Sequence, residues 1–193
     1  MNGRALLAME LAVAALVVPV LLPVRPRLVW NASPSVPTGL YWIAPAARLA
    51  PGQRLAVRMP EPWAALMARR GYLPAGVALI KPLAAEAGTR VCRFGQRVTL
   101  AGRLVAVARL RDRAGRTLPV WSGCIRLAPD QLFLLAPARA DSVDSRYFGV
   151  VPRRAVLGVA HPVWTDERGT GHRVWFAARR PLLRSSALPR LRS

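Results

Sequence analysis

Lys81 is the residue of this chain best suited to act as a base. Of the 29 basic residues it is the only lysine, and the other 28 are arginines. A lysine amine can lose its proton inside a protein, whereas an arginine guanidinium keeps it. Lys81 ends the apolar run 77–80, where burial would lower its pKa and leave a neutral amine able to take a proton from a hydroxyl. The alternative is an ordinary solvated lysine at a strand end.

A serine hydroxyl is the natural partner of such a base, and two serines stand two residues apart in the segment NASPSVPTGLYW, residues 31–42. Ser33 and Ser35 alternate with Pro34 and Pro37, which fix backbone torsions and would present each hydroxyl in a defined direction. The two histidines come late in the chain and suggest no Ser-His-Asp arrangement. A Ser/Pro-rich linker is the other interpretation of this segment.

A third polar block, ADSVDSRYFGVVP, covers residues 140–152. So many short polar side chains are typical of a tight loop that hydrogen-bonds to itself. Within it Asp144 and Arg146 could form a structural ion pair, and the hydroxyl of Ser142 could reach a neighbouring amine.

The elements that must position these residues are mainly short strands. Apolar runs broken by Gly and Pro predict strands at 40–44, 54–59, 76–82, 89–94, 97–110, 132–136 and 155–164. Ala101 and Gly102 predict a hairpin turn inside the 97–110 run. Only the segment 61–72 spaces its apolar residues as a helix does. The sequence therefore predicts a mainly β domain over residues 30–167.

The N-terminal segment 1–29 predicts a membrane anchor. Residues 5–24 are apolar apart from Glu10, which matches the ~20 residues that a helix needs to cross a bilayer. A cleaved signal peptide is the alternative. Arg25 and Arg27 weakly favour a cytoplasmic side for the residues that follow. Residues 168–193 hold seven arginines and no acid, and are interpreted as a basic tail that lies on anionic lipid or is disordered.

Composition and cysteine spacing limit the function classes. The formal net charge is +20, but the basic residues are scattered through apolar segments, so nucleic acid is not expected as a partner. Cys92 and Cys124 show no metal-binding or redox spacing, and no cofactor is expected. In an oxidising periplasm they could form a disulfide, and two separate buried thiols are the alternative.

Three blocks, SPSVPTGLYW, ALIKPLAAEAGTRV and DSVDSRYFGVVP, stand in this order behind the apolar N-terminal segment. Together they resemble the bacterial type I signal peptidase family. The Gly-Leu-Tyr ending of the first block is most similar to the TraF branch, the peptidases of conjugative transfer systems. The resemblance covers roughly residues 30–160, and the last block is its most specific part.

The resemblance implies a role for each polar residue named above. Ser35 would be the nucleophile and Lys81 its general base. The Ser33 hydroxyl would join the Ser35 backbone N–H in an oxyanion hole. Ser142 would orient the lysine. Asp144 matches an aspartate regarded as structural in general signal peptidases and as a catalytic candidate in the TraF branch, so both roles stay open.

Two departures from the family pattern bear on the branch. The first is Pro34, which stands where a glycine is common between the two serines. The second is that the second membrane segment of some signal peptidases is missing, and this favours the TraF-like branch.

The resemblance implies an antiparallel β fold at the periplasmic face of the inner membrane. It also implies a secreted precursor as substrate, for the TraF branch a conjugative pilin, with hydrolysis and cyclisation both open. A general signal peptidase and a non-catalytic basic membrane protein are the rival interpretations.

Overall fold

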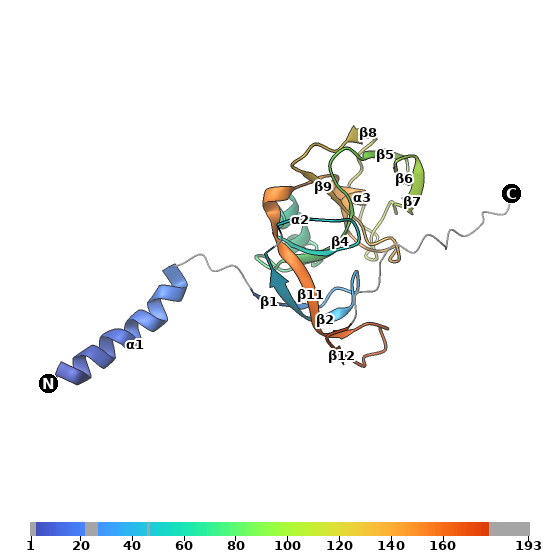
Figure 1. The fold of residues 1–193 in the computed structure, drawn as a ribbon. Coiled ribbons are helices and arrows are strands. Elements are labelled where there is room, and N and C mark those ends of the chain that lie inside the picture. The colour runs from blue at the N-terminus through green and yellow to red at the C-terminus, as the bar shows by residue number, and fades with distance from the viewer. Residues whose placement is uncertain (1–2, 22–26, 46, 178–193) are drawn as a thin grey trace.

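The computed structural model describes residues 3–21, 27–45 and 47–177 of the chain. Helix α1 (Gly3–Leu21) stands apart from a β-rich body that contains all the other elements (Figure 1). The body is built from antiparallel strands in two sheets. The predicted fold class, mainly antiparallel β, is confirmed.

The larger sheet has eight strands in the order β1-β2-β11-β3-β4-β9-β10, with β12 beside β11. Its strands are β1 (Leu28–Asn31), β2 (Thr38–Ala44), β3 (Arg54–Val57), β4 (Leu79–Ala85), β9 (Gln131–Leu134), β10 (Val151–Pro152), β11 (Val156–Asp166) and β12 (Val174–Trp175). The long strand β11 pairs with β2 over one part of its length and with β3 over another. It thereby joins β1 and β2 to the rest of the sheet.

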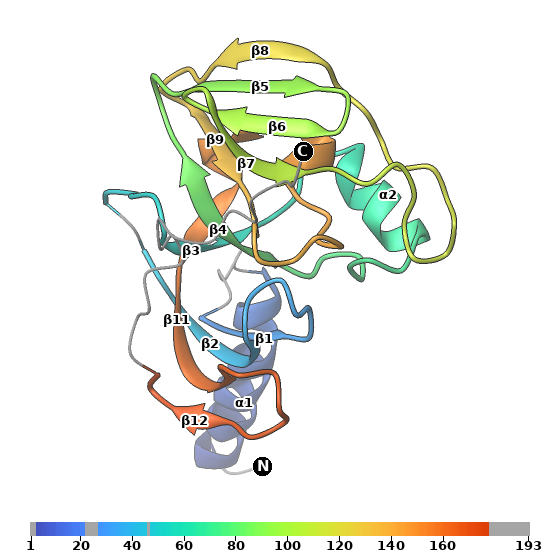
Figure 2. The same ribbon diagram turned by 90° about the vertical axis from the view of Figure 1, so that its right-hand side faces the viewer.

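The smaller sheet has the order β7-β6-β5-β8 and lies at the opposite end of the body from β12 (Figure 2). It consists of β5 (Arg90–Phe94), β6 (Arg97–Leu100), β7 (Arg103–Val107) and β8 (Gly123–Arg126). The predicted hairpin turn joins β6 to β7, where Ala101 and Gly102 both have positive φ, 48° and 82°. Cys92 and Cys124 face each other in the β5–β8 register and form a disulfide, with Cα atoms 4.0 Å apart.

Two helices and one 3-10 turn complete the body: α2 (Trp63–Arg69), α3 (Ser145–Phe148) and η1 (Arg153–Ala155). Helix α2 lies within the predicted helical segment 61–72, and Met67 is its most buried residue. The main apolar cluster includes Met67, Leu55, Leu83 and Leu134, so α2 packs on the core shared by β3, β4 and β9.

Strand β4 is buried along almost its whole length. Leu79 and Leu83 belong to the main apolar cluster, whereas Ile80 belongs to a second cluster with Tyr41 of β2. A residue on this strand is therefore surrounded by protein whichever way its side chain points. This is the strand that carries Lys81.

Several elements fall where the sequence predicts none, among them the strands β1, β8, β10 and β12 and the helix α3. Helix α3 occupies part of the predicted loop 140–152, because the Asp144 side chain caps its first turn. Strand β12 lies beyond the predicted domain boundary at residue 167. The Asp166 carboxylate accepts hydrogen bonds from the N–H groups of Gly169 and Gly171, which turns the chain back onto β11. The sheet thus extends into the predicted tail, whose residues 178–193 lie outside the described residues.

Helix α1 covers most of the apolar segment for which a membrane anchor is predicted, and side chains such as Leu7, Met9 and Leu11 are exposed on it. Residues 1–2 and 22–26 of the predicted anchor 1–29 are outside the described residues. Among the helices that the structure describes, none is both long and apolar enough to cross a membrane.

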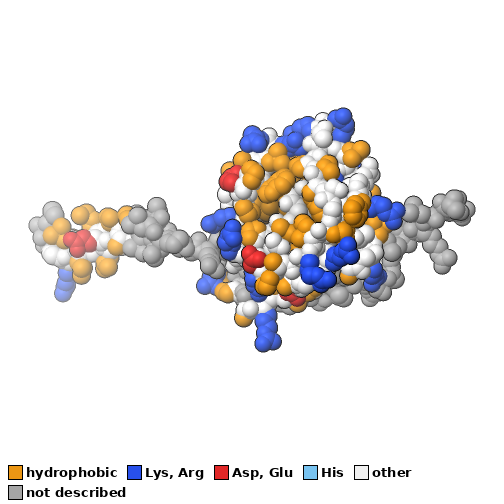
Figure 3. All heavy atoms as spheres, turned by 90° about the horizontal axis from the view of Figure 1, so that it is seen from above, with side chains coloured by type: hydrophobic (Ala, Val, Ile, Leu, Met, Phe, Trp, Pro, Cys, Tyr) orange, Lys and Arg blue, Asp and Glu red, His pale blue; other side chains and the backbone are white. Residues whose placement is uncertain are grey.

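Basic side chains are distributed widely over the molecule, and acidic ones are few. Figure 3 shows arginines at many points around the body, with apolar patches between them. The excess of basic over acidic side chains agrees with the formal net charge of +20.

Candidate active site

A cleft of about 730 Å³ opens beside the N-terminal end of β4. The loop between β1 and β2 forms one wall and carries Ser33 and Ser35. The segment between α2 and β4 and the segment after β7 form other walls, and the loop 139–143 closes the cleft near Lys81. The three polar blocks recognised in the sequence therefore meet in one place.

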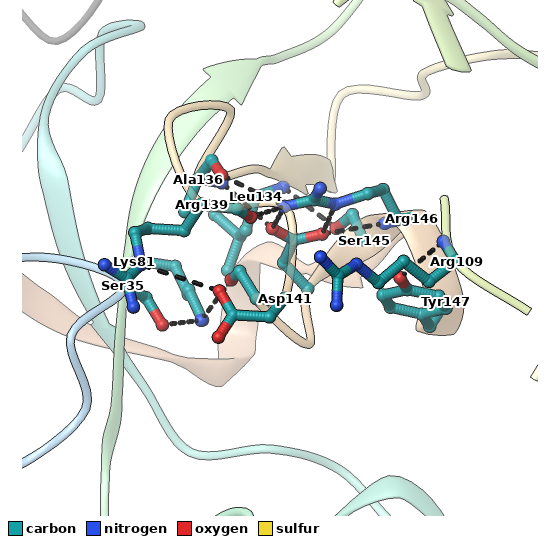
Figure 4. Close-up of polar contacts among 12 residues, drawn as sticks. Ser35, Lys81, Arg109, Leu134, Ala136, Arg139, Asp141, Ser145, Arg146 and Tyr147 are labelled. Atoms are coloured by element: carbon teal, nitrogen blue, oxygen red, sulfur yellow. Dashed lines mark hydrogen bonds and ion pairs between the residues drawn. The ribbon is translucent and has the colours of Figure 1, made fainter. Parts of the chain in front are cut away.

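Lys81 lies at the base of this cleft and is 2% exposed. It pairs with Leu55 of β3 in the sheet register, which fixes its backbone. Its Nζ is hydrogen-bonded to Oγ of Ser35 and lies 2.7 Å from Oγ of Ser142 (Figure 4). One amine thus joins hydroxyls that are separated from it by 46 and 61 residues in the sequence.

The surroundings of Lys81 lower its pKa from the usual 10.5 to about 8. Burial is the main cause, because the charged ammonium loses hydration inside the protein. The carboxylate of Asp144 opposes this effect and the guanidinium of Arg146 adds to it. A neutral amine is therefore accessible near neutral pH.

The loop 31–37 holds both serine hydroxyls at the cleft. Oγ of Ser33 and Oγ of Ser35 are hydrogen-bonded at 2.8 Å. The buried side chain of Asn31 closes the loop, since its Nδ2 donates to the carbonyl oxygens of Ser33 (2.8 Å) and Pro37 (3.1 Å) while its Oδ1 accepts from the N–H of Ser33. The Tyr41 hydroxyl also donates to the Pro37 carbonyl, at 2.7 Å.

Asn31 was not predicted as a site residue. Its place at the start of the NASPSVP segment is the one signal that the sequence gives for it. The role of its amide could not be predicted, because the contacts to the loop backbone exist only once the loop has folded.

Asp144 and Arg146 form a buried ion pair, with exposures of 0% and 1%. The guanidinium contacts both carboxylate oxygens, at 2.9 and 2.8 Å. It also donates to the carbonyl oxygens of Ala136 (3.0 Å) and Arg139 (2.8 Å). The carboxylate accepts the N–H groups of Ala136 and Arg146. These contacts tie the loop after β9 to α3.

Ser142 is held on this framework. Its N–H donates to the Arg139 carbonyl at 3.1 Å, and Arg139 is itself fixed through that carbonyl by Arg146. The ion pair therefore supports the residue that contacts Lys81, and Asp144 makes no hydrogen bond to Ser35 or Lys81 among the described residues.

Chemically, the Ser35 hydroxyl is hydrogen-bonded to the Lys81 amine, whose pKa is lowered. The Ser33 hydroxyl lies beside that of Ser35, and the Ser142 hydroxyl lies beside the amine. Such an amine can remove the proton of the Ser35 hydroxyl and make its oxygen a nucleophile.

The family model of signal peptidase, peptidase S26, matches residues 3–165 of the chain. The chain belongs to the signal peptidase family. This membership identifies it as a serine peptidase.

The curated relatives of this signal peptidase include TraF proteins. A probable conjugal transfer protein TraF of Sinorhizobium fredii is 40% identical over 145 residues, which are 70% of this chain and 76% of the relative. The conjugal transfer protein TraF of Agrobacterium fabrum is 32% identical over 70% of this chain and 81% of its own length. The plasmid transfer protein TraF of Escherichia coli is 30% identical with the same coverage. The chain thus falls in the TraF-like branch.

Among solved structures, a signal peptidase I of Enterococcus faecalis is similar. The similarity covers 60% of this chain and 98% of that chain, with 18% sequence identity and a TM-score of 0.35.

The structure brings together most of the residues predicted for the site of this signal peptidase. Ser33, Ser35, Lys81 and Ser142 line the cleft. Asp144 and Arg146 lie behind the loop that carries Ser142. Cys92 and Cys124 are in the smaller sheet, away from the cleft.

Proposed function

We propose that this signal peptidase cleaves a secreted precursor with Ser35 as nucleophile and Lys81 as general base. The observation that carries the proposal is the buried amine of Lys81 hydrogen-bonded to Ser35 and Ser142 at the base of a cleft. A merely structural lysine would have an acidic partner, whereas the groups in contact with this amine are hydroxyls.

In the proposed reaction, the neutral amine of Lys81 takes the Ser35 proton while Oγ attacks the carbonyl carbon of the scissile bond. The Ser33 hydroxyl and the Ser35 N–H would stabilise the oxyanion of the tetrahedral intermediate. The protonated amine then gives its proton to the leaving nitrogen, and the C–N bond breaks to leave an acyl-enzyme. Water or another amine attacks the ester and regenerates the Ser35 hydroxyl.

We propose a conjugative pilin precursor as the substrate, because the related TraF proteins are named for conjugal and plasmid transfer. If an α-amine of the precursor attacks the acyl-enzyme, the product is a cyclic pilin, and if water attacks, it is linear. The two products differ in mass by one water, so mass spectrometry of the processed precursor distinguishes them. Cleavage of many unrelated signal peptides instead would indicate a general signal peptidase.

We propose that the catalytic domain acts on the periplasmic side of the inner membrane. The apolar segment 5–24 supports membrane attachment. The disulfide between Cys92 and Cys124 supports an oxidising compartment. Arg25 and Arg27 favour the opposite orientation, but two arginines are a weak determinant.

The change Lys81→Arg tests the mechanism, because guanidinium keeps the charge but does not give up its proton. Activity on the precursor should fall by at least about 10³-fold, to the level of Ser35→Ala, and the double variant should be no worse than either. Lys81→Met, which adds no bulk, should lose as much. Ser122→Ala changes a serine outside the cleft and should keep full activity.

Folding of each variant would be checked by thermal melting. Substantial cleavage by folded Lys81→Arg would overturn the assignment of Lys81 as general base and with it the serine/lysine mechanism.

A further inference from the structure

One part of the cleft is lined by arginines. The segment 109–116, RLRDRAGR, places an arginine at every second position and then one more three residues later. Half of its residues are arginines, against 28 of 193 in the whole chain. With two arginines from other loops they form what we call the arginine rim: Arg70, Arg109, Arg111, Arg113, Arg116 and Arg139.

The acidic groups of the cleft do not balance the arginine rim. Among the described residues that line the cleft, only Asp112 and Asp141 are acidic. Asp112 accepts hydrogen bonds from Arg116 at 2.7 Å and from Tyr72 at 2.5 Å. Asp141 is paired with Arg113 and with Arg139. Both carboxylates are therefore already engaged, and six arginines against two aspartates leave a formal surplus of positive charge.

Arg109 is the clearest member of this surplus. Its backbone N–H donates to the Tyr147 hydroxyl at 3.0 Å, which fixes the residue at the cleft. Its guanidinium makes no hydrogen bond or ion pair with the described part of the chain, and the residue is exposed. Figure 4 draws Arg109 and Arg139 in the same close-up as Ser35 and Lys81. Arg111 donates only to a carbonyl of its own loop, that of Gly115.

We propose that the arginine rim binds a carboxylate side chain, Asp or Glu, of the precursor near the bond that is cleaved. The inference deepens the proposed function and rests on it, because the same cleft would hold the substrate. A guanidinium presents paired donors that match the two oxygens of a carboxylate, and a cleft concentrates the field of its charged walls. The substrate class is thus a peptide with an acidic residue beside the scissile bond.

The main rival explanation is the charge of the whole molecule. Arginines lie at many points on the face shown in Figure 3, and a net charge of +20 attracts acidic peptides to any surface. The test therefore needs a control that removes the same charge elsewhere. Arg97 and Arg103 are exposed on the smaller sheet and do not line the cleft.

The experiment is calorimetric titration of the full-length Ser35→Ala protein in detergent, which leaves the probes uncut. The probes are two capped, amidated alanine-based decapeptides that differ only in a central Glu-Glu or Gln-Gln pair. At low salt we expect the Glu-Glu peptide to bind at least tenfold more tightly, and this difference should shrink in high salt. Equal affinities would overturn the proposal.

The variant Arg109→Gln/Arg111→Gln should remove most of the Glu-Glu preference, whereas Arg97→Gln/Arg103→Gln should keep it. Equal losses in the two double variants would show attraction by net charge alone and would also overturn the proposal. A Gln-Gln peptide with a free C-terminus supplies the other carboxylate source. If the free C-terminus strengthens binding of the Gln-Gln peptide while the Glu-Glu pair does not strengthen binding of the amidated peptide, the rim recognises a chain end and the proposal is wrong.

Failure of this inference and failure of the proposed function are distinguishable. If wild-type protein cleaves the precursor but shows no Glu-Glu preference, only the rim proposal falls. If the preference is present but Ser35 and Lys81 prove dispensable for cleavage, the rim stands as a peptide-binding surface and the catalytic mechanism falls.

Discussion

The amine of Lys81 experiences opposing influences on its protonation. Burial disfavours the ammonium, and Arg146 acts in the same direction, while Asp144 and Asp141 favour it. Neither carboxylate is in hydrogen-bonding contact with the amine, because Asp144 is occupied by Arg146 and Asp141 by two other arginines. The loss of hydration therefore dominates. The Asp144–Arg146 ion pair holds the loop near Lys81 in place, and it does not bring the pKa of the amine back to its usual value.

This balance predicts the pH profile of the enzyme. Below a pH of about 8 the amine is protonated, so kcat/KM should fall tenfold for each pH unit, and above it kcat/KM should level off. The folded-state pKa lies below the unfolded value, so the contribution of Lys81 to stability should rise with pH between about 8 and 10.5. Initial rates and thermal melts across pH would measure both. A kcat/KM independent of pH from 6 to 9 would contradict the assignment.

Asp144 is predicted to act as a positioning residue. Asp144→Asn should reduce stability by about 3–5 kcal/mol, because Arg146 keeps a buried charge that has lost its partner. Activity should fall through displacement of Ser142, and the pH midpoint of the residual activity should shift. Denaturant melts and rates on the same preparations test this. A fully stable Asp144→Asn enzyme without turnover would assign Asp144 a catalytic role instead.

The sequence could predict the chemistry at Ser35 and Lys81 because their types are restrictive: one lysine in an arginine-rich chain and a serine between prolines. It could not predict the contacts of Asn31 or the arginine rim. Asn31 acts by joining backbone positions of a curled loop. The rim assembles arginines from three separate segments, and the sequence shows that 109–116 is rich in arginine but not that this segment lines the cleft.

Among the elements, most strands that coincide with an apolar run were predictable, including the four-residue strands β3, β6 and β9. Strands β2 and β11 lie in apolar runs bounded by Gly and Pro, and the β6–β7 hairpin turns at Ala101 and Gly102, as the sequence predicts. Strand β8 carries mostly exposed residues, so it lacks the apolar signal, and it is held by pairing and a disulfide with β5. Helix α3 depends on the cap by Asp144, which only the folded loop provides.

The packing of strand β2 against β11 yields a prediction for Gly39, which lies where the two strands approach closely. Its φ is +135°, and a Cβ there would lie 2.9 Å from the Cα of Thr165. Gly39→Ala should therefore cost at least about 2 kcal/mol of stability through strain and overpacking, and it should disturb the nearby serine loop. Gly52→Ala is the control, since Gly52 also has positive φ but open space around it. Equal losses in denaturant melts would contradict the packing argument.

At the scale of the whole molecule, the cleft is lined by segments attached to both sheets. The larger sheet supplies Lys81 and the serine loop, while the segment between β7 and β8 brings four of the six arginines of the rim from the smaller sheet. The disulfide fixes β8 to β5 and so restrains that segment at its far end. In the proposed function, catalysis and most of the contacts to an acidic substrate residue would thus come from segments attached to different sheets.

The proposed attachment to the membrane yields the last prediction. The side chains of Leu11 and Val13 are exposed on α1, so an apolar phase is the environment that suits them. Cells that produce the full chain should therefore retain it in the membrane fraction after alkaline carbonate washing. Leu11→Glu/Val13→Glu should release it, while the apolar pair Leu11→Ile/Val13→Leu should not.

An epitope placed after Ser193 should be digested by protease in spheroplasts but not in intact cells if the domain is periplasmic. A processed, freely soluble full-activity form would instead support removal of the segment as a signal peptide, and an epitope protected in spheroplasts would place the domain in the cytoplasm, as Arg25 and Arg27 weakly suggest.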